Sequence, residues 1–419
     1  MTKTILMITY NYPPLTISSG IQRSLAFSRF LPENGWQPIV LTPSSGAYAN
    51  KSDSGEKLIP EKVIRESSFA LDSSRHLAPF GKYPEFMALP DRWWTWRLSA
   101  VKKGLELIKK YKPDVIWSTF PISTTHWIAS ILKRKTGIPW VADFRDPMTK
   151  EGYPVERLTR AVRKSIEKRT VNLADVVTFT APSSVKLYSQ CYPHLSQSKW
   201  QIIYNGYDED NFSIALNIAQ SQTEKANLSD QRPKTLLHSG TLYPLERNPE
   251  SFFQAIKELK EGGVFTPQRI KIVLRATNND ELYKRRIADG DIVDLVDILP
   301  PVKYEDALAE MVCADGLLVL QAAICNHQIP AKIYEYFRAQ KPILALTDRD
   351  GDTAFILKKG GIENIADITS VAEIKRLLTE FVNGETATVM PSETSYLEFS
   401  RKNQTVEFAR LLNELTANG

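Results

Sequence analysis

The stretch Gln328-Ile-Pro-Ala-Lys332-Ile-Tyr-Glu335-Tyr-Phe-Arg-Ala-Gln-Lys341-Pro342-Ile-Leu-Ala-Leu joins a short polar loop, a helical pattern and an apolar strand. The spacing places Lys332 and Glu335 on one helix face, near the first turn. Backbone N–H groups and the helix dipole favour a phosphate there, and the lysine adds positive charge. A carboxylate beside such a site can hold ribose hydroxyls. The segment therefore predicts a nucleotide-sugar pocket or, in a simpler interpretation, a surface helix with an ion pair.

Short apolar strands alternate with amphipathic helices throughout the chain, which predicts doubly wound parallel sheets. At 419 residues the chain is too long for one core and fits two domains of about 200 residues. Two polar stretches, 44–57 and 213–234, are expected to form mobile loops. Strands are expected in the second half at 234–238, 270–275, 293–298, 316–320 and 342–346.

The composition, 42% hydrophobic and 24% charged, is that of an ordinary soluble protein. No apolar run approaches the roughly 20 residues that span a bilayer. The N-terminus enters a strand without a basic region or cleavage site, so we expect a cytoplasmic protein. The three cysteines form no CxxC pair, which argues against a disulfide framework or a zinc site.

Charge is divided unevenly along the chain. Residues 1–205 carry 29 basic and 16 acidic residues, net +13, whereas residues 206–419 carry 24 and 32, net −8. A basic half favours an anionic partner or an anionic membrane surface, although lysines can also simply solvate helices. A membrane contact could use the aromatic run 92–97 and the basic helix pattern at 157–168. The alternative is that the tryptophans belong to the core.

Four further segments accompany the first. Strand 5–10 runs through a Pro-Pro loop into a helix near Gly20, and strand 138–143 ends in Asp143-Phe-Arg145-Asp146-Pro147. Residues 205–212 read Asn-Gly-Tyr-Asp-Glu-Asp-Asn-Phe, and 236–249 hold Ser-Gly240-Thr241 followed by Arg247-Asn-Pro. In this order and spacing the segments resemble the GT-B glycosyltransferases, in particular the large retaining, family 4-like group of bacterial surface polysaccharide synthesis.

The resemblance implies a GT-B fold, with two Rossmann-like domains facing a cleft. Residues 1–205 would bind the acceptor and be completed by a C-terminal helix at about 396–419. Residues 206–395 would bind the nucleotide-sugar donor. We therefore expect a retaining hexosyl- or N-acetylhexosaminyltransferase that uses a nucleotide diphosphate sugar, UDP-sugar favoured, and a glycan or lipid-linked acceptor. The alternatives are a non-catalytic GT-B scaffold that binds nucleotide or glycan, and a sugar-nucleotide epimerase.

The resemblance also assigns roles to single residues. Lys332 and Arg247 are expected at the leaving diphosphate and His126 at the transferring sugar, although one histidine in an aromatic setting can equally be a core residue. On the acceptor side, the aspartates and arginines could instead form a buried pair that fixes a loop. The remaining donor-side candidates are Gly240, Thr241, Arg275, His327, Glu335 and Gly20, and the acceptor-side candidates are Arg23, Asp143, Arg145 and Asp146.

The sequence departs from the family pattern at two places. The loop after Gly240 has one arginine, Arg247, and no lysine, where the family commonly has both. His327 stands where the first of two glutamates, eight positions apart, is usual. It could hydrogen-bond a sugar hydroxyl or be a plain loop residue. The run Asp348-Arg-Asp350-Gly-Asp352 fails as a calcium loop because its twelfth position is Lys359. We expect no required metal, no cofactor besides the donor, possible peripheral membrane contact and no nucleic acid.

Overall fold

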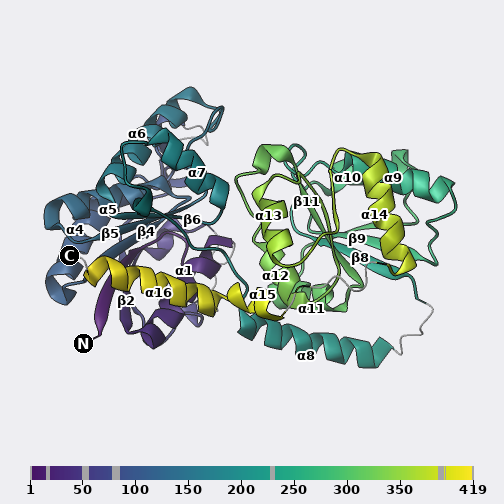
Figure 1. The fold of residues 1–419 in the computed structure, drawn as a ribbon. Helices are drawn as coiled ribbons and strands as arrows, with labels where there is room; N and C mark the ends of the chain where they lie inside the picture. The colour runs from purple at the N-terminus through teal and green to yellow at the C-terminus, as the bar shows by residue number, and fades with distance from the viewer. Residues whose placement is uncertain are drawn as a thin grey trace. The chain divides into compact units, whose positions relative to one another are not determined.

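The computed structural model describes residues 2–15, 19–49, 56–77, 85–226, 232–385, 391 and 393–417 (Figure 1). The chain divides into two compact units. Unit 1 comprises Met1–Asn205 and Arg401–Gly419, and unit 2 comprises Gly206–Ser400.

Unit 1 is built on a seven-stranded parallel sheet of order β3-β2-β1-β4-β5-β6-β7. Its strands are β1 Lys3–Ile8, β2 Trp36–Pro43, β3 Ile64–Ser68, β4 Val115–Thr119, β5 Trp140–Arg145, β6 Val176–Phe179 and β7 Trp200–Ile202. Its helices are α1 Ser19–Phe30, α3 Ser73–His76, α4 Trp96–Tyr111, α5 Ser123–Thr136, α6 Arg157–Leu173, α7 Pro182–Cys191 and α16 Arg401–Ala417, with 3₁₀ turns η1 Leu31–Asn34, η2 Ser45–Ala47, η4 Glu85–Ala88 and η5 Gln197–Lys199.

Unit 2 is built on a six-stranded parallel sheet of order β10-β9-β8-β11-β12-β13. Its strands are β8 Lys234–Ser239, β9 Ile270–Arg275, β10 Val296–Leu299, β11 Gly316–Gln321, β12 Ile343–Thr347 and β13 Ile365–Ala366. Its helices are α8 Glu209–Ala226, α9 Glu250–Glu261, α10 Asp280–Asp289, α11 Tyr304–Cys313, α12 Lys332–Ala339, α13 Asp352–Lys359, α14 Val371–Asn383 and α15 Glu393–Glu398, with the 3₁₀ turn η6 Ala323–Cys325.

Both faces of the unit 1 sheet are buried, which explains why its strands are apolar at successive positions. In β1, Ile5 and Met7 belong to one apolar cluster, and Leu6 and Ile8 belong to the other. The C-terminal helix α16 lies beside α1 (Figure 1) and covers the first of these faces, where Phe408 stacks on a phenylalanine of α1 at 4.6 Å. Segments from the two ends of the chain therefore share one core.

The predicted doubly wound parallel sheets are confirmed, and four of the five strands expected in unit 2 agree within two residues. The fifth, β10, begins at Val296 instead of residue 293. The mobile loop expected at 213–234 is wrong for the residues up to 226, which lie in α8. This helix contacts α11, and its buried residues Phe212, Ala215 and Ala219 are mostly small, so the apolar face is hard to detect in a polar stretch. Of the stretch 44–57, residues 50–55 lie outside the described part.

Among the described residues no helix is both long and apolar enough to cross a membrane. In the aromatic run 92–97, Trp96 is buried and the other two tryptophans are half-buried. Trp96 is fully buried and its Nε1 donates to Ser68 Oγ at 2.9 Å, whereas Trp93 contacts Tyr10 in a tilted arrangement with 4.2 Å between ring centroids. These indoles therefore contribute to the core.

Candidate active site

The two central strands of unit 2, β8 and β11, mark the point where the strand order reverses. From β8 the chain proceeds outward to β9 and β10, and it then returns to β11 on the other side of β8. Ligands of open parallel sheets bind beyond the carboxyl ends of the strands at such a point. The loop after β8 holds Gly240, and the loop after β11 leads into α12. The sheet therefore brings these two segments to one edge.

Lys332, the first residue of α12, lies against the loop after β8. Its Nζ is 3.2 Å from Nε2 of His238, the penultimate residue of β8. Gly240 has φ +116°, and a Cβ at that position would lie 3.0 Å from the same Nζ. Burial and the nearby Arg247 guanidinium lower the pKa of Lys332 well below its ordinary value, although Glu335 opposes this. Glycine at 240 therefore allows the ammonium group to approach the loop closely.

Arg247 closes the loop that follows β8. Its Nη1 donates to the Thr241 carbonyl at 2.8 Å, and its Nε donates to Gln321 Oε1, at the end of β11, at 3.3 Å. The guanidinium also lies 5.3 Å from the ring centroid of Tyr243. The arginine is therefore held by the loop after β8 and by the last residue of β11. Its positive charge is close enough to lower the pKa of Lys332.

Glu335 lies one turn after Lys332. Its Oε1 accepts a hydrogen bond of 2.6 Å from the Tyr304 hydroxyl, at the start of α11. The adjacent Tyr336 hydroxyl accepts from the backbone N–H of Ser239 at 3.1 Å. These bonds tie α12 to α11 on one side and to β8 on the other. We define the Lys332 cluster as His238, Gly240, Arg247, Lys332 and Glu335.

His238 was missed by sequence reasoning. It is fully buried, and its Nδ1 lies 2.9 Å from the Leu318 carbonyl. Burial first, and then the charge of Lys332, lower its pKa well below the ordinary value. A polar ring inside a buried strand, two residues before a glycine, is the signal that could have drawn attention to it.

The other donor-side candidates make different contacts. The Arg275 guanidinium forms an ion pair with Glu310 and donates to the Pro300 carbonyl at 2.7 Å, so its side chain is engaged away from Lys332. Its backbone carbonyl accepts from Gly240 N–H at 2.8 Å, and thus it shapes the loop through the main chain. The Thr241 hydroxyl accepts from Asn278 at 2.7 Å.

The loop after β11 carries His327 and is joined to the aspartate-rich turn at the end of β12. Asn326 Nδ2 donates to Asp348 Oδ2 at 2.6 Å, and the Asp352 N–H donates to the Asn326 carbonyl at 3.1 Å. His327 is half-buried in this loop, eight residues before Glu335. The aspartate-rich turn therefore supports the loop that precedes α12.

In unit 1 the structure pairs Arg23 with Asp143. The guanidinium makes two bonds of 3.0 Å to the carboxylate and also donates to the carbonyls of Ile203 and Tyr204. Asp143 accepts further bonds from the hydroxyls of Thr119 and Thr178. Both charged side chains are almost completely buried, at 3% and 0% exposure. The pair therefore joins α1, β5 and the chain following β7 from inside the unit.

Arg145 and Asp146 follow at the carboxyl end of β5, where the pairing with β6 is irregular. Arg145 has φ +62°, a strained conformation for a residue with a side chain. A Cβ on Gly20 would lie 2.9 Å from its Nη1 and 2.7 Å from Asn11 Nδ2, so these residues meet at one edge of the sheet. Burial raises the pKa of Asp146, although Arg145 beside it opposes this.

His126 lies in the interior of unit 1 with no exposed surface. Its Nδ1 is 2.8 Å from Ser118 Oγ, and its ring lies 4.8 Å from that of Phe144 and 6.2 Å from that of Trp140. Burial lowers its pKa to about 3. These contacts are those of a core histidine in unit 1.

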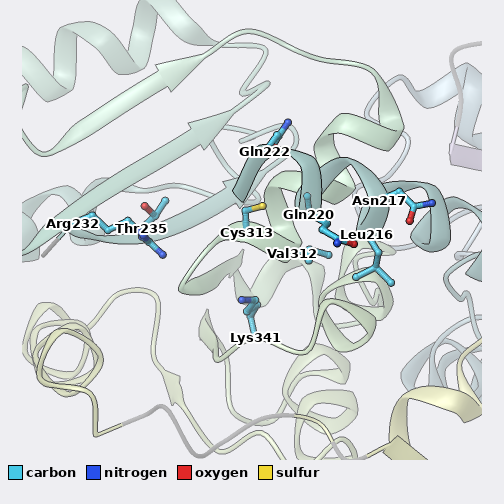
Figure 2. A pocket seen from close by; sticks show the side chains of 10 residues that line it. Leu216, Asn217, Gln220, Gln222, Arg232, Thr235, Val312, Cys313 and Lys341 are labelled. Atoms are coloured by element: carbon cyan, nitrogen blue, oxygen red, sulfur yellow. The ribbon is translucent and has the colours of Figure 1, made fainter. Parts of the chain in front are cut away.

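A cavity of about 700 Å³ lies elsewhere in unit 2, by the amino ends of the central strands (Figure 2). It is lined by α8, the end of α11, Thr235 near the start of β8, and Lys341 just before β12. Arg232 at its rim pairs with Asp315 at 2.6 Å. Because Thr235 and Gly240 lie at opposite ends of β8, this cavity is separate from the Lys332 cluster.

Comparison with known proteins agrees with this architecture. The family model described as Glycosyltransferase Family 4 matches residues 20–211. A glycosyltransferase from Rickettsia africae ESF-5 superposes with a TM-score of 0.69 at 14% identity, over 100% of both chains. Anabaena Alr3699/HepE in complex with UDP and glucose gives 0.67 at 16% identity, over 98% of this chain and 100% of that chain. A UDP-forming α,α-trehalose-phosphate synthase from Burkholderia vietnamiensis gives 0.68 at 12% identity, over 100% of both. No curated protein matches by sequence.

Two parallel Rossmann-like sheets in this order define the GT-B fold, as expected from the sequence. The chain therefore has the GT-B fold, and residues 20–211 match the family model of Glycosyltransferase Family 4.

Proposed function

We propose that the protein is a retaining transferase that moves a hexosyl or N-acetylhexosaminyl group from a nucleotide diphosphate sugar, with UDP as the favoured nucleotide. The observation that carries the proposal is the Lys332 cluster, in which two cations and a carboxylate meet beyond β8 and β11. The UDP and glucose bound to HepE support the choice of nucleotide and sugar. The acceptor in this proposal is a glycan or lipid-linked saccharide of surface polysaccharide synthesis.

The cluster suits a reaction in which a diphosphate leaves. As the bond between the anomeric carbon and the diphosphate oxygen breaks, negative charge grows on that oxygen, and fixed cations stabilise it. We assign this role to Lys332 and Arg247. The backbone N–H groups at Thr241 and at the start of α12 add donors to the phosphates, whereas the Gly240 N–H already donates to the Arg275 carbonyl. The acceptor oxygen forms the new bond on the same face of the sugar, and its proton leaves with the diphosphate. We propose that this requires no metal ion or other cofactor.

We assign Glu335 to the ribose hydroxyls and His327 to the sugar or the loop that encloses it. Arg275 shapes the Gly240 loop through its backbone carbonyl. Because Glu335 and Lys332 are one turn apart, the first turn of α12 would bind both the ribose and the diphosphate.

In unit 1 we assign the acceptor to the edge formed by Gly20, Arg145 and Asp146. The strained backbone at Arg145 supports this choice, because such strain concentrates at binding sites. The buried pair of Arg23 and Asp143 holds that edge from inside unit 1. His126 packs in the core against Phe144, the residue before Arg145. A trehalose-phosphate synthase from Burkholderia xenovorans is bound to glucose-6-phosphate, which supports an anionic acceptor.

We also propose a cytoplasmic protein with peripheral contact to an anionic membrane. Val155 and Leu158 are 76% and 56% exposed, and the basic residues Arg157 and Arg160 lie beside them. Co-sedimentation with phosphatidylglycerol vesicles tests this, and equal pelleting of wild type and a Val155→Ser, Leu158→Ser variant would reject it.

The test of function is transfer from a panel of UDP-, GDP- and ADP-sugars to acceptors, with wild type, Lys332→Ala and Glu335→Ala. For wild type we expect release of the nucleotide only when acceptor is present. In both variants we expect this release to be lost although the protein is folded. Release without an acceptor, or interconversion of the sugar, would indicate an epimerase or hydrolase. Nucleotide binding without turnover would indicate a scaffold, which the single arginine after Gly240 and the histidine at 327 also favour. Normal turnover in both variants would reject the site.

A further inference from the structure

His238 joins the two central strands of unit 2 to α12. It lies next to the end of β8 with no exposed surface. One ring nitrogen, Nδ1, is 2.9 Å from the Leu318 carbonyl on β11, and the other, Nε2, is 3.2 Å from Lys332 Nζ. Both nitrogens of the ring are therefore within hydrogen-bond distance of a partner on a different element.

These two partners determine where the ring proton lies. A carbonyl oxygen only accepts hydrogen bonds, so Nδ1 must carry the hydrogen and donate to Leu318. A neutral imidazole has one such hydrogen, which leaves the lone pair on Nε2 as an acceptor for the Lys332 ammonium. Burial and the charges of Lys332 and Arg247 keep the ring neutral, because they outweigh the hydrogen bonds to the Leu318 and Gly240 backbones and lower its pKa well below the ordinary value.

We propose that His238, as the neutral tautomer protonated on Nδ1, is a positioning residue that holds the ammonium group of Lys332 over Gly240 for the phosphates of the donor. The ammonium group has three N–H bonds, and donation of one to His238 orients the other two. The close approach to Gly240, where a Cβ would lie 3.0 Å from Nζ, limits the space in which Nζ can move. A lysine that is ordered before binding loses less entropy when the ligand arrives. The ligand's identity rests on the proposed function, whereas the tautomer and the pairing do not.

Two substitutions separate the two ring nitrogens. In His238→Asn the side-chain amide replaces Nδ1 and can still donate to Leu318, but nothing reaches Lys332. In His238→Gln the amide oxygen reaches the position of Nε2 and can accept from Lys332. With isothermal titration calorimetry of UDP, we expect Kd to rise at least about tenfold in His238→Asn, the loss of one hydrogen bond to a charged group, and to recover most of this in His238→Gln. Equal Kd in Asn, Gln and wild type would overturn the proposal.

A double-mutant cycle distinguishes positioning from general damage to the fold. In the Lys332→Met background the Asn and Gln variants should bind UDP equally, because the group that His238 orients is gone. Circular dichroism and thermal melting identify any variant that fails to fold. If the tenfold difference between Asn and Gln persisted in the Lys332→Met background, His238 would act by another route and the proposal would be wrong.

Nitrogen-15 NMR of the histidines in the full chain decides the pairing without any ligand. We expect one signal set of a neutral ring with the proton on Nδ1, unchanged from about pH 5 to pH 8, whose Nε2 shift changes in Lys332→Met. This signal set is assigned to His238 by its absence from the spectrum of His238→Gln. A proton on Nε2, or an imidazolium in this range, would overturn the proposal. If the NMR result holds but wild type binds no nucleotide, the proposed function fails and the pairing stands.

Discussion

The Tyr304 hydroxyl donates a hydrogen bond of 2.6 Å to Glu335 Oε1, which connects the first residue of α11 to the first turn of α12. The carboxylate is therefore held by a neighbouring helix before any ligand arrives. Such support from a second element reduces the disorder that binding has to remove. Because Lys332 lies three residues earlier, one short helix carries two of the three charged residues of the site.

Comparison of UDP with UMP should separate the roles of Glu335 and Lys332. If the carboxylate holds ribose, Glu335→Ala weakens both nucleotides by a similar factor of about ten to a hundred, the range for hydrogen bonds to a charged group. Lys332→Ala should weaken UDP far more than UMP, because only UDP has a diphosphate. Calorimetry measures the affinity for both nucleotides. Tyr304→Phe should show a loss of affinity between those of wild type and Glu335→Ala. Unchanged UMP affinity in Glu335→Ala would remove the ribose assignment.

Substitution at Gly240 should impair nucleotide binding beyond its effect on stability. Gly240→Ala places a methyl group 3.0 Å from Lys332 Nζ at φ +116°. Gly263→Ala is the matched control, because its φ is also positive, +70°, and nothing lies within 4 Å of the added carbon. Both variants should lose roughly 1 kcal/mol of stability to backbone strain. A drop in UDP affinity is expected only in Gly240→Ala, and equal affinity in the two would argue against the close approach.

At a pH above the lowered pKa of free Lys332, diphosphate binding should be accompanied by proton uptake at this residue, whereas below that pKa the free protein already holds the ammonium group. Its pKa is lowered in the free protein, and a bound anion raises it again. Between these two pKa values the complex holds more protons than the free protein, so affinity falls as pH rises through this window. Calorimetry in buffers of different ionisation enthalpy measures the uptake, and Lys332→Met should abolish it. Identical heats in all buffers for wild type would contradict the expectation.

The buried pair of Arg23 and Asp143 should contribute strongly to stability. Removal of one partner, as in Asp143→Asn, leaves a buried charge and costs about 3–5 kcal/mol. The control Asp297→Asn breaks the half-exposed pair with Lys271 and should cost about 0–1 kcal/mol. Urea unfolding of both variants measures the difference.

The stability that the Arg23–Asp143 pair contributes depends on pH and decreases on acidification. Burial raises the pKa of Asp143, but Arg23 and hydrogen bonds outweigh it and bring the pKa below its ordinary value. Its contribution is therefore complete above the unfolded pKa of about 4 and is lost as pH falls through the folded pKa. A wild-type stability that rose on acidification below pH 4 would contradict this.

The core position of His126 predicts acid sensitivity. Its pKa of about 3 lies below the unfolded value of about 6.5, so the unfolded chain binds an extra proton between these values. Stability should fall as pH decreases through this range, with a slope of up to about 1.4 kcal/mol per pH unit from this group. His126→Gln should remove that slope, whereas His194→Gln, at an exposed position, should not. An unchanged slope in His126→Gln would place the histidine outside the core.

Much of the fold followed from local pattern. The apolar runs of β1 and β11, and the alternation of such strands with amphipathic helices, predict parallel sheets covered on both faces. The three-residue spacing of Lys332 and Glu335 predicts one helix face, and the structure places both in the first turn of α12. Helix α8 was not predicted, because its buried residues are mostly small.

The sequence by itself determined most of the elements, their order and the identity of the charged residues near the strand ends, because backbone geometry gives helices and strands fixed periods that side-chain polarity reveals. Only the tertiary structure decided the partners. Arg23 pairs with Asp143, 120 positions away, whereas Arg275 pairs with Glu310 instead of lying beside Lys332. Lys332 meets His238 across 94 positions. A long charged side chain can reach several groups, and the packing of distant elements selects which of them it meets.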